Sequence, residues 1–453
     1  MTTTTPNLSD RVRSLMSQAH HDLAELVACQ SVADPRQFPA SECLKAARLV
    51  IDNFTAAGMR DVRLEDTPDG HPAVYGHIPG PDGAPTVLLY CHYDVQPPLD
   101  PTGTAWKTPP FELVERDGRW YGRGASDCKG NIVAHLTALR ALRDDLHVGV
   151  KLIAEGSEEQ GTGGLEAFVP SHADLLRADA IIVADSGNFA DGAPTFTTSL
   201  RGLANVVVTV STLQNAMHSG MFGGPAPDAL QALIHMLATL RDARGNTTVD
   251  GLEATGTWPG VDYAPARFRV DAHVLDGVDL TGDGRPQDLL WSRPAVTVLG
   301  IDCPPVVGSA AAIPAQARAR INLRVPPGMA ARHAQDALIA HLQAVAPWHA
   351  QVQIEREADG DPFTARTDGP AYTAMAGALG EAYDKPTTTA GQGGSIPLCN
   401  VLQETYPEAE ILMLGVEEPR CLIHAPNESV DPAEIERIAL AEALFLTRYE
   451  AAS

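Results

Sequence analysis

Apolar residues return at every third or fourth position in two stretches near the start of the chain, 9–29 and 41–57, and this spacing predicts amphipathic helices. Short, continuous apolar runs follow at 86–90, 148–154 and 180–184 and predict strands buried on both faces. Strands and helices in such an order are typical of a parallel or mixed sheet covered by helices. We therefore predict an α/β fold for this part of the chain.

The pattern changes after residue 199. The elements predicted there are strands at 204–212, 295–301, 315–325 and 351–357 and helices at 227–241 and 329–345. We interpret 200–362 as an inserted α+β domain. The first domain, 1–199, then resumes over 363–453, with helices predicted at 371–383 and 432–448. A glycine- and aspartate-rich stretch at 245–294 carries no motif that we can place. It either shapes substrate access or is a tolerated surface insertion, and we favour the second interpretation.

Length and charge narrow the class of protein. A chain of 453 residues exceeds one ordinary core, so two domains are the default expectation. Lys and Arg number 33 against 57 Asp and Glu, which gives a net charge of -24 and argues against nucleic acid and anionic membrane surfaces as partners. No apolar run in the sequence approaches the roughly 20 residues that a membrane span requires.

The seven cysteines are scattered along the chain, and no two of them form a Cys-x-x-Cys pair. This distribution argues for a reducing compartment and against a disulfide scaffold or a structural zinc cluster. The first residues have neither a basic start nor an apolar core, so they do not resemble a secretory signal. We expect a cytoplasmic protein.

Polar side chains that can bind metals follow each of the three buried strand candidates. His92 and Asp94 come after the first strand, Glu158 and Glu159 after the second, and Asp185 after the third. Ligands of open α/β sheets gather outside the carboxyl ends of the strands. We therefore expect these side chains to lie along one edge of the sheet.

Two further segments supply side chains of the same chemistry. They are Gly122-Arg-Gly-Ala-Ser-Asp127-Cys-Lys-Gly130 and His424-Ala-Pro-Asn-Glu428. Oxygen and nitrogen donors of this kind suit zinc, manganese or cobalt rather than a metal selected by thiolates. The candidate ligands are His92, Asp127, Glu159, Asp185 and His424.

The candidate ligands predict a site that activates water. One carboxylate between two metal ions, flanked by one His and one carboxylate for each ion, is a known arrangement for this chemistry at neutral pH. Asp94 is placed to orient the imidazole of His92, two residues away. Of the adjacent Glu158 and Glu159, one is available to a metal and the other is free to take a proton from water.

The chain resembles the M20 metallopeptidases, and within them the branch of carnosinases and cytosolic non-specific dipeptidases. The resemblance covers essentially the whole length and rests on motifs in a fixed order. These are His92-Tyr-Asp-Val-Gln-Pro97, Trp106-Lys-Thr-Pro-Pro-Phe-Glu-Leu113, the Asp127 segment, Glu155–Gly161, His218-Ser-Gly-Met-Phe-Gly-Gly224, Gly393-Gly-Ser-Ile-Pro397 and His424-Ala-Pro-Asn-Glu428. It implies a di-metal catalytic domain, with a mixed sheet covered by helices, and an inserted lid and dimerisation domain.

The same resemblance implies the role of each ligand. Asp127 would bridge two divalent ions, with His92 and Asp185 on one ion and Glu159 and His424 on the other. The ions would be zinc or manganese, with cobalt as a third possibility.

Further roles follow from the resemblance for residues beyond the ligands. Glu158 would be the general base that helps a metal-bound hydroxide attack, and later the proton donor to the leaving amine. His218 would reach into the active site of the partner subunit in a homodimer and stabilise the oxyanion. Arg324 would bind the free carboxylate of the substrate, although on chemistry alone Arg201 is equally capable. The residues that would line the same pocket are Gly393, Gly394 and Ser395.

Cys128 is a departure from the family pattern. The residue after the bridging carboxylate is often acidic in this branch, which puts the metal preference of the chain in question. We interpret Cys128 as a buried structural thiol rather than a nucleophile. The resemblance also implies a non-proline cis peptide between Asp127 and Cys128.

These observations leave three hypotheses about function. The first is a di-metal dipeptidase that cleaves small dipeptides with a free carboxyl terminus. The second is an N-acyl-amino-acid amidohydrolase, such as an aminoacylase or desuccinylase, with the same metals and the same carboxylate recognition. The third, a non-catalytic metal-binding protein, is disfavoured because all five candidate ligands and Glu158 are present.

Overall fold

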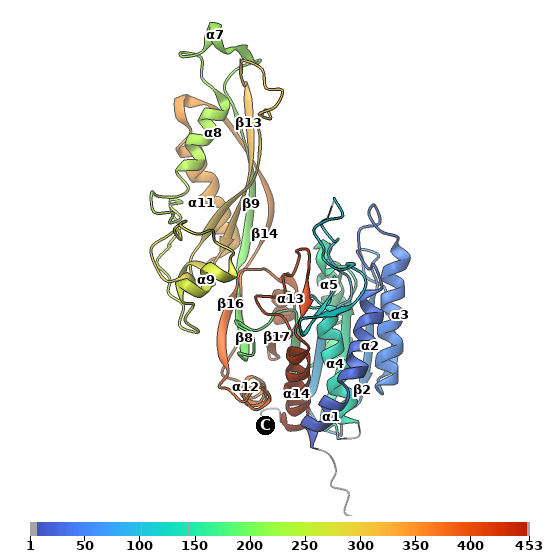
Figure 1. Cartoon of the computed structure of the whole chain (residues 1–453). Helices are drawn as coiled ribbons and strands as arrows, with labels where there is room; N and C mark the ends of the chain where they lie inside the picture. The colour runs from blue at the N-terminus through green and yellow to red at the C-terminus, as the bar shows by residue number, and fades with distance from the viewer. Residues whose placement is uncertain (1–6, 101, 144, 451–453) are drawn as a thin grey trace, which may run out of the picture. The chain divides into compact units, whose positions relative to one another are not determined.

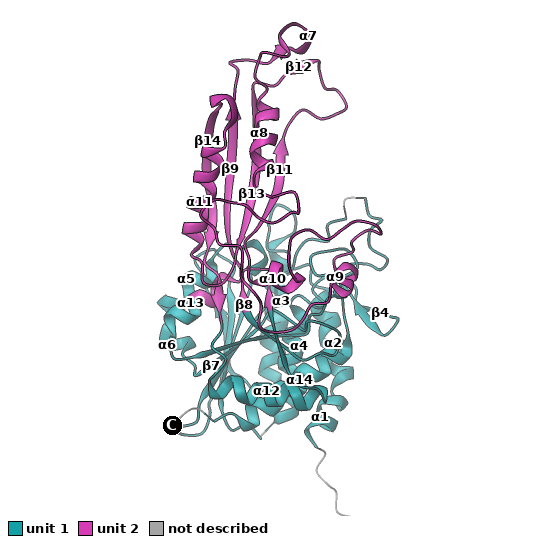
Figure 2. Cartoon of the chain, turned by 90° about the vertical axis from the view of Figure 1, so that its left-hand side faces the viewer, with its two compact units in different colours: residues 1–198, 365–390, 401–453 teal, residues 199–364, 391–400 magenta. Residues whose placement is uncertain are grey.

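The computed structural model describes residues 7–100, 102–143 and 145–450. The chain divides into two compact units, coloured separately in Figure 2. The first unit comprises 1–198, 365–390 and 401–453, and the second comprises 199–364 and 391–400. The predicted limits after residues 199 and 362 lie within two residues of the main limits of these units, whereas 391–400, which the prediction assigns to the first domain, belongs to the second unit. This segment packs with the second unit, where the backbone N–H of Arg201 donates to the carbonyl of Gln392.

The first unit is built on a mixed sheet (Figure 1). Its strand order is β1 (Arg60–Glu65), β2 (Ala73–Ile78), β6 (Gly149–Glu155), β3 (Thr86–His92), β7 (Ala180–Ala184), β17 (Glu410–Leu414) and β8 (Thr195–Leu200). β3 runs parallel to β6 and β7, and β17 runs parallel to β7, whereas β2 is antiparallel to β6. β15 (Phe363–Thr364) and β16 (Thr388–Gln392) both pair with β8. The predicted mixed sheet is confirmed.

Helices of the first unit cover this sheet. α4 packs on β3, α12 on β17 and α3 on β2, and α14 packs against α4 and α12. Every residue of β7, and every residue of β3 after Thr86, is buried, which explains why these strands are continuous apolar runs rather than alternating ones. The helices are α1 (Leu8–Ser14), α2 (Met16–Val27), α3 (Ala40–Ala56), α4 (Lys129–Leu142), α5 (Gly164–Ser171), α6 (Ala173–Leu176), α12 (Pro370–Tyr383) and α14 (Pro432–Arg448). A further helix, α13 (Pro397–Thr405), begins in the second unit and ends in the first.

The predicted helix at 9–29 is divided in two. α1 ends at Ser14 and α2 begins at Met16, because the N–H of Leu15 donates to the carbonyl of Val12 three residues back. The hydrogen bonds of the next turn start from Leu15, whose carbonyl accepts from Ala19. The apolar spacing continues across this tight turn, so the sequence pattern gives no sign of the break.

A small sheet positions two loops of the site in the first unit. β5 (Arg119–Tyr121) pairs with β4 (Val114–Arg116) on one side and with β18 (Ser429–Val430) on the other. β5 directly precedes the loop that carries Asp127, and β18 directly follows Glu428. Pairing of β5 with β18 therefore brings segments about 300 positions apart in the sequence side by side.

The second unit contains an antiparallel sheet with the order β11 (Ala295–Asp302), β13 (Gln316–Val325), β9 (Gly202–Ser211) and β14 (Gln351–Gly360). α8 (Ala229–Ala238) and α11 (Ala331–Ala344) pack on it. Ala204, Val206, Val208 and Val210 of β9 are fully buried, so alternate side chains form the core face. The short elements are β10 (Met217–His218), α7 (Ser219–Phe222), α9 (Pro265–Asp271), α10 (Pro286–Trp291) and β12 (Ala312–Ile313).

The stretch 245–294 is a folded part of the second unit. Trp258, Tyr263 and Trp291 are buried, with ring centroids of Trp258 and Trp291 5.2 Å apart. The buried carboxylate of Asp288 accepts the backbone N–H of Trp258 at 2.7 Å. Aromatic packing and this hydrogen bond hold a segment whose composition alone is typical of a loop.

Among the described residues, none of the helices combines the length and the apolar character that crossing a bilayer demands.

We predict that Leu233→Ala in α8 lowers the free energy of unfolding by about 2–5 kcal/mol, because it leaves a cavity in the core of the second unit. Leu233 is fully buried there. The matched control is Ile234→Ala on the same helix, where the side chain is 46% exposed and the expected loss is within about 0.5 kcal/mol. Urea denaturation followed by circular dichroism measures both variants, and equal losses would contradict the assigned packing.

Candidate active site

Three parallel strands bring candidate ligands to one edge of the sheet. His92 is the last residue of β3, and Asp185 directly follows β7. Glu158 and Glu159 lie in a short 3-10 helix, Glu158–Gln160, just after β6. β3 lies between β6 and β7 in the sheet, so the three strand ends are neighbours. The edge predicted from the sequence is the one at which these side chains meet.

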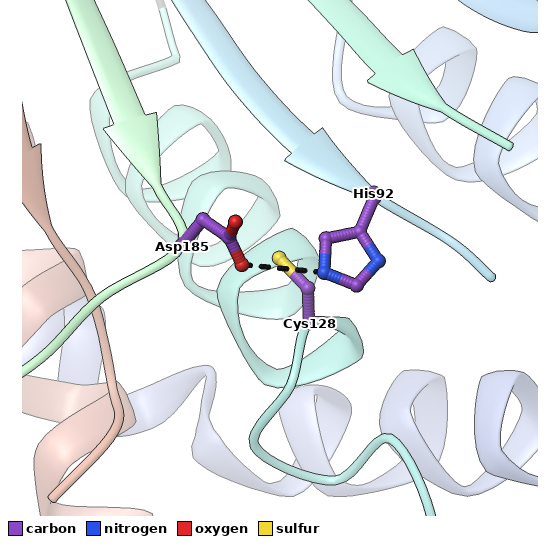
Figure 3. Close-up of side chains that lie close together, drawn as sticks. All are labelled: His92, Cys128 and Asp185. Atoms are coloured by element: carbon purple, nitrogen blue, oxygen red, sulfur yellow. Dashed lines mark hydrogen bonds and ion pairs between the residues drawn. The ribbon is translucent and has the colours of Figure 1, made fainter. Parts of the chain in front are cut away.

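The first cluster forms around the imidazole of His92 (Figure 3). Its Nε2 atom lies 3.0 Å from Oδ1 of Asp127. It also lies 3.2 Å from Oδ1 of Asp185, the contact drawn in the figure. Cys128, at the start of α4, points its sulfur toward the same place. All four side chains are buried.

The second cluster forms around His424. Its Nε2 atom lies 3.0 Å from Oδ2 of Asp127 and 3.1 Å from Oε2 of Glu159. The two carboxylate oxygens of Asp127 therefore face two different imidazoles. Each imidazole has a second carboxylate beside it, Asp185 for His92 and Glu159 for His424.

The donor set fits divalent cations. Asp127, Glu159 and His424 each offer one ligand atom within 4.8 Å of the others, and so do His92, Cys128 and Asp185. Imidazole nitrogen and carboxylate oxygen are the donors that zinc, manganese and cobalt accept in proteins. The arrangement has two imidazoles and one shared carboxylate, which matches the requirement of a two-ion site.

The close packing of acids and imidazoles in the site shifts their pKa values. Hydrogen bonds to Asp127 and Glu159 raise the pKa of His424 to about 11. Burial raises the pKa of Asp127, but hydrogen bonds from His424 and His92 outweigh it, and the net pKa is lowered. Burial also raises the pKa of Asp185 and of Glu159. Positive charge on the imidazoles would thus offset part of the negative charge of the surrounding acids.

Asp94 fixes both the imidazole and the neighbouring acidic loop. Nδ1 of His92 lies 3.1 Å from the backbone carbonyl of Asp94 and 3.3 Å from its Oδ1. The Asp94 carboxylate accepts the backbone N–H groups of Glu158 and Glu159, each at 3.1 Å. With Nδ1 donating to Asp94, Nε2 of His92 is the nitrogen that would give up its proton and present a lone pair to a metal ion. Asp94 therefore orients His92, and it also holds the segment that carries two acids.

Glu428 anchors the loop of Asp127. Its Oε1 atom accepts the backbone N–H groups of Ser126 at 3.0 Å and of Asp127 at 3.1 Å. Its Oε2 atom accepts a hydrogen bond from the N–H of Gly124 at 3.0 Å. The same atom forms an ion pair with Nη1 of Arg123, which donates to it at 2.7 Å. Glu428 ends the motif His424-Ala-Pro-Asn-Glu428, and no role for it was predicted from the sequence. Its function in the structure is to position Asp127.

Glu417 is a carboxylate that the sequence analysis missed. It is buried and offers an oxygen within 4.8 Å of ligand atoms of Asp127 and Asp185. Burial, and then the negative charges of Asp127 and Asp185, raise its pKa well above the ordinary range. Glu417 follows β17, which is parallel to β7, so it lies beyond another strand end at the same edge. Because ligands gather beyond the carboxyl ends of parallel strands, Glu417 becomes a candidate once β17 is recognised as a strand.

Cys128 is inert as a nucleophile in this setting. Its thiol donates to the backbone carbonyl of Ala184 at 3.0 Å, and burial raises its pKa to about 12. The peptide bond between Asp127 and Cys128 is cis, as the family resemblance implied.

The remaining predicted residues belong to the second unit. Arg324 lies on β13 and Gly393 follows β16, and both are next to the buried Arg201. A Cβ atom at Gly393 would lie 2.9 Å from Nη2 of Arg201, so a larger residue there would make this guanidinium shift. Gly394 and Ser395 follow in the same turn. His218 lies on β10, is exposed, and accepts the N–H of Gly220 at its Nδ1 atom, 3.1 Å away.

Comparison with known proteins places these motifs in a family. Residues 88–448 match peptidase family M20/M25/M40. The chain belongs to this family. It is a metallopeptidase, a hydrolase of peptide C–N bonds, and the clustered imidazoles and carboxylates are where an M20 peptidase of this sequence would hold divalent metal ions.

Alignments with similar proteins extend over almost the whole length of this M20 chain. The cysteinylglycine-S-conjugate dipeptidase of Corynebacterium striatum is 42% identical over 436 residues, which cover 94% of each chain. The Beta-Ala-His dipeptidase of Rattus norvegicus is 28% identical over 447 residues, covering 90% of this chain and 88% of the other. The crystal structure of human carnosine dipeptidase 1 shares the fold with a TM-score of 0.81 at 24% identity, over 97% of this chain and 98% of that one.

We predict that loading the metal-free M20 peptidase with zinc or manganese at neutral pH releases protons. The raised pKa values of His92 and His424 keep both imidazoles protonated in the absence of metal, whereas a ligand must present a lone pair. Because the protons compete with the cations, metal affinity falls as the pH is lowered. Calorimetric titrations in buffers of different ionisation enthalpy count the protons, and we expect more than one per chain.

The matched control for this prediction replaces a histidine outside the clusters. His424→Asn is expected to remove part of the proton release, whereas His333→Asn, at an exposed position of α11, is expected to leave it unchanged. Metal binding without proton release would contradict the assignment of the imidazoles as ligands.

Proposed function

We propose that this M20 peptidase is a dipeptidase, which uses two divalent metal ions to hydrolyse small dipeptides with a free C-terminal carboxylate. The observation that carries the proposal is the position of Asp127, whose two carboxylate oxygens face two imidazoles that each have a further carboxylate beside them. The names of the similar proteins, which act on cysteinylglycine S-conjugates and on Beta-Ala-His, support dipeptides as the substrate class.

The metal ligands follow from the two clusters. Asp127 would bridge two ions, with His92 and Asp185 binding one and Glu159 and His424 the other. Bound ions of this kind polarise a carbonyl oxygen and lower the pKa of water. Zinc, manganese and cobalt all suit these donors. Glu428 and Asp94 would keep the ligands in place by holding the Asp127 loop and the His92 ring.

Glu158 would move the proton. It would accept a proton from water as the water oxygen attacks the peptide carbonyl carbon, and would donate it to the amide nitrogen as the C–N bond breaks. Burial, followed by the charge of Asp185, raises the pKa of Glu158, which favours uptake of the proton. The hydrogen bond from the Glu158 N–H to Asp94 fixes the backbone from which this carboxylate extends.

Arg324 would bind the free carboxylate of the substrate. Burial lowers the pKa of its guanidinium, and no carboxylate of the described residues contributes to that shift. A guanidinium without an acidic partner is suited to a carboxylate ligand, which it can bind through two parallel hydrogen bonds. The turn of Gly393, Gly394 and Ser395 would line the same pocket.

His218 would stabilise the oxyanion in the active site of a partner subunit. Its Nδ1 atom accepts a hydrogen bond from Gly220, which leaves Nε2–H as the outward donor. Large exposed apolar side chains support a homodimer formed through the second unit. They include Met221 and Phe222 beside His218 (74% and 42% exposed), Val306 and Val307 (93% and 90%), and Val298, Leu299 and Ile301 on the edge strand β11.

We also propose that the protein is cytoplasmic and binds neither nucleic acid nor anionic membranes. Seven scattered cysteines fit a reducing cytoplasm, and a net charge of -24 argues against nucleic acid and anionic membranes as partners.

We predict that the protein, stripped and reloaded with zinc or manganese, hydrolyses free dipeptides faster than N-acetylated dipeptides or N-acyl amino acids. The panel is tested at equal concentrations, with the release of free amino acid as the readout. Dipeptide amides serve as a second comparison, because loss of the C-terminal carboxylate is expected to raise KM through Arg324. Preference for the acylated compounds would move the protein to the amidohydrolases and overturn the dipeptidase proposal.

We predict that two inactive variants restore activity when they are mixed. Glu158→Gln removes the proton-transfer group and is expected to lower kcat by about 100-fold or more while metal is retained, and His218→Ala removes the oxyanion donor. In a hybrid dimer, the subunit with intact Glu158 receives His218 from its partner, so one of the two sites is complete. Dissociation and reassociation of the mixture should therefore recover activity.

The control for the mixing experiment is each variant taken alone through the same treatment. If His218 acts within its own subunit, every site in the hybrid lacks one group, and no activity returns. Metal content measured on both variants separates loss of chemistry from loss of the ions.

A further inference from the structure

A cavity of about 650 Å³ lies within the second unit. The segment 245–294 forms most of its wall, and the side chains that line it are largely apolar, among them Phe268, Val274, Leu280 and Leu289. Cavities of this size and character are typical of sites for small organic ligands. The segment 245–294, which carries no motif that we can place, therefore builds most of this cavity.

Arg201 is the unusual residue of this wall. It is 9% exposed, and its Nε and Nη1 atoms have no hydrogen-bond partner among the described residues. Arg241 and Arg293 line the same cavity but donate to backbone carbonyls, those of Gly245 and Gly256 among them. A buried guanidinium without a partner is costly in free energy, because it has lost its water and gained no acceptor.

The surroundings of Arg201 do not neutralise its charge. Burial and then the positive charge of Arg324 lower the pKa of Arg201 to about 10. The adjacent Gln392 is neutral, and its buried Oε1 atom also lacks a partner. Asp279 lines the cavity but is exposed, and it contributes nothing to the pKa of Arg201. None of the groups that influence the pKa of Arg201 is therefore an acid that would neutralise it.

We propose that this cavity binds a small monocarboxylate with an apolar body, whose carboxylate pairs with Arg201 while the apolar body fills the enclosure. A carboxylate matches the planar fork of a guanidinium and restores the hydrogen bonds that Nε and Nη1 lack. The apolar wall excludes water from the ion pair and strengthens it. The site lies within the second unit and does not depend on the proposed peptidase chemistry.

The test measures binding of 4-phenylbutanoate to the full-length Glu158→Gln protein stripped of metal, by isothermal titration calorimetry. We expect the acid to bind and the neutral 4-phenylbutanamide to bind at least 10-fold more weakly, because only the acid pairs with the guanidinium. Equal binding of the acid and the amide, or no binding of either, would overturn the proposal. Because metal and turnover are absent, failure of the dipeptidase proposal does not affect this result.

Two matched variants assign the binding to this guanidinium. Arg201→Leu is expected to weaken binding of the acid at least 10-fold, whereas Arg324→Leu, the same change at a neighbouring guanidinium, is expected to leave it within about threefold. The opposite pattern would place the ligand at Arg324 and reject the cavity. Leu289→Trp fills the enclosure without removing the charge and is expected to abolish binding.

A melting experiment separates a binding role of Arg201 from a structural one. Removing an unpartnered buried charge does not destabilise a fold, so Arg201→Leu is expected to melt at the wild-type temperature or above it. A large drop in melting temperature would indicate a structural role for Arg201. In that case Leu289→Trp and the comparison of acid with amide still decide whether the cavity binds the ligand.

Discussion

The structure of the first unit depends on holding like charges close together. The side chains of Asp127, Asp185, Glu159 and Glu417 converge on one place, with Glu158 beside them. Repulsion and burial disfavour such a group of acids unless cations or protons balance it, which is why most of their pKa values are raised. The fold must supply enough stability elsewhere to keep these ligands assembled.

Two carboxylates that are not candidate ligands show how this is achieved. Glu428 accepts three backbone N–H groups of the Asp127 loop together with the guanidinium of Arg123. Asp94 accepts two N–H groups of the Glu158–Glu159 turn and also holds the imidazole of His92. Both acids are fully buried, so their hydrogen bonds act without competition from water. The candidate ligands are thus held in place by contacts to the backbone.

The elements predicted correctly from the sequence are those whose burial leaves a clear pattern of apolar residues. The runs of β3 and β7 are buried on both faces, so they stand out as apolar, and the ligands at their ends follow from strand order. α4 escaped notice because nearly all its residues are buried, including Lys129, Asn131 and His135, so it has no polar face to mark a helical period. Glu417 was missed with β17, a short strand recognisable only through its pairing with β7. The position of 391–400 likewise depends on long-range contacts that local periodicity does not encode.

The two units carry opposite imbalances of charge. In the first, buried acids outnumber the groups that balance them, and the family explains the excess by metal ions. In the second, Arg201 and Arg324 lie near each other with no carboxylate contributing to the pKa of either. In both units, a fold tolerates an unpaired buried charge when a bound ligand of opposite charge offsets it. An acidic chain with net charge -24 had many carboxylates available to pair with these arginines, so their isolation is informative. This isolation is the observation behind the anion binding proposed for Arg201 and for Arg324.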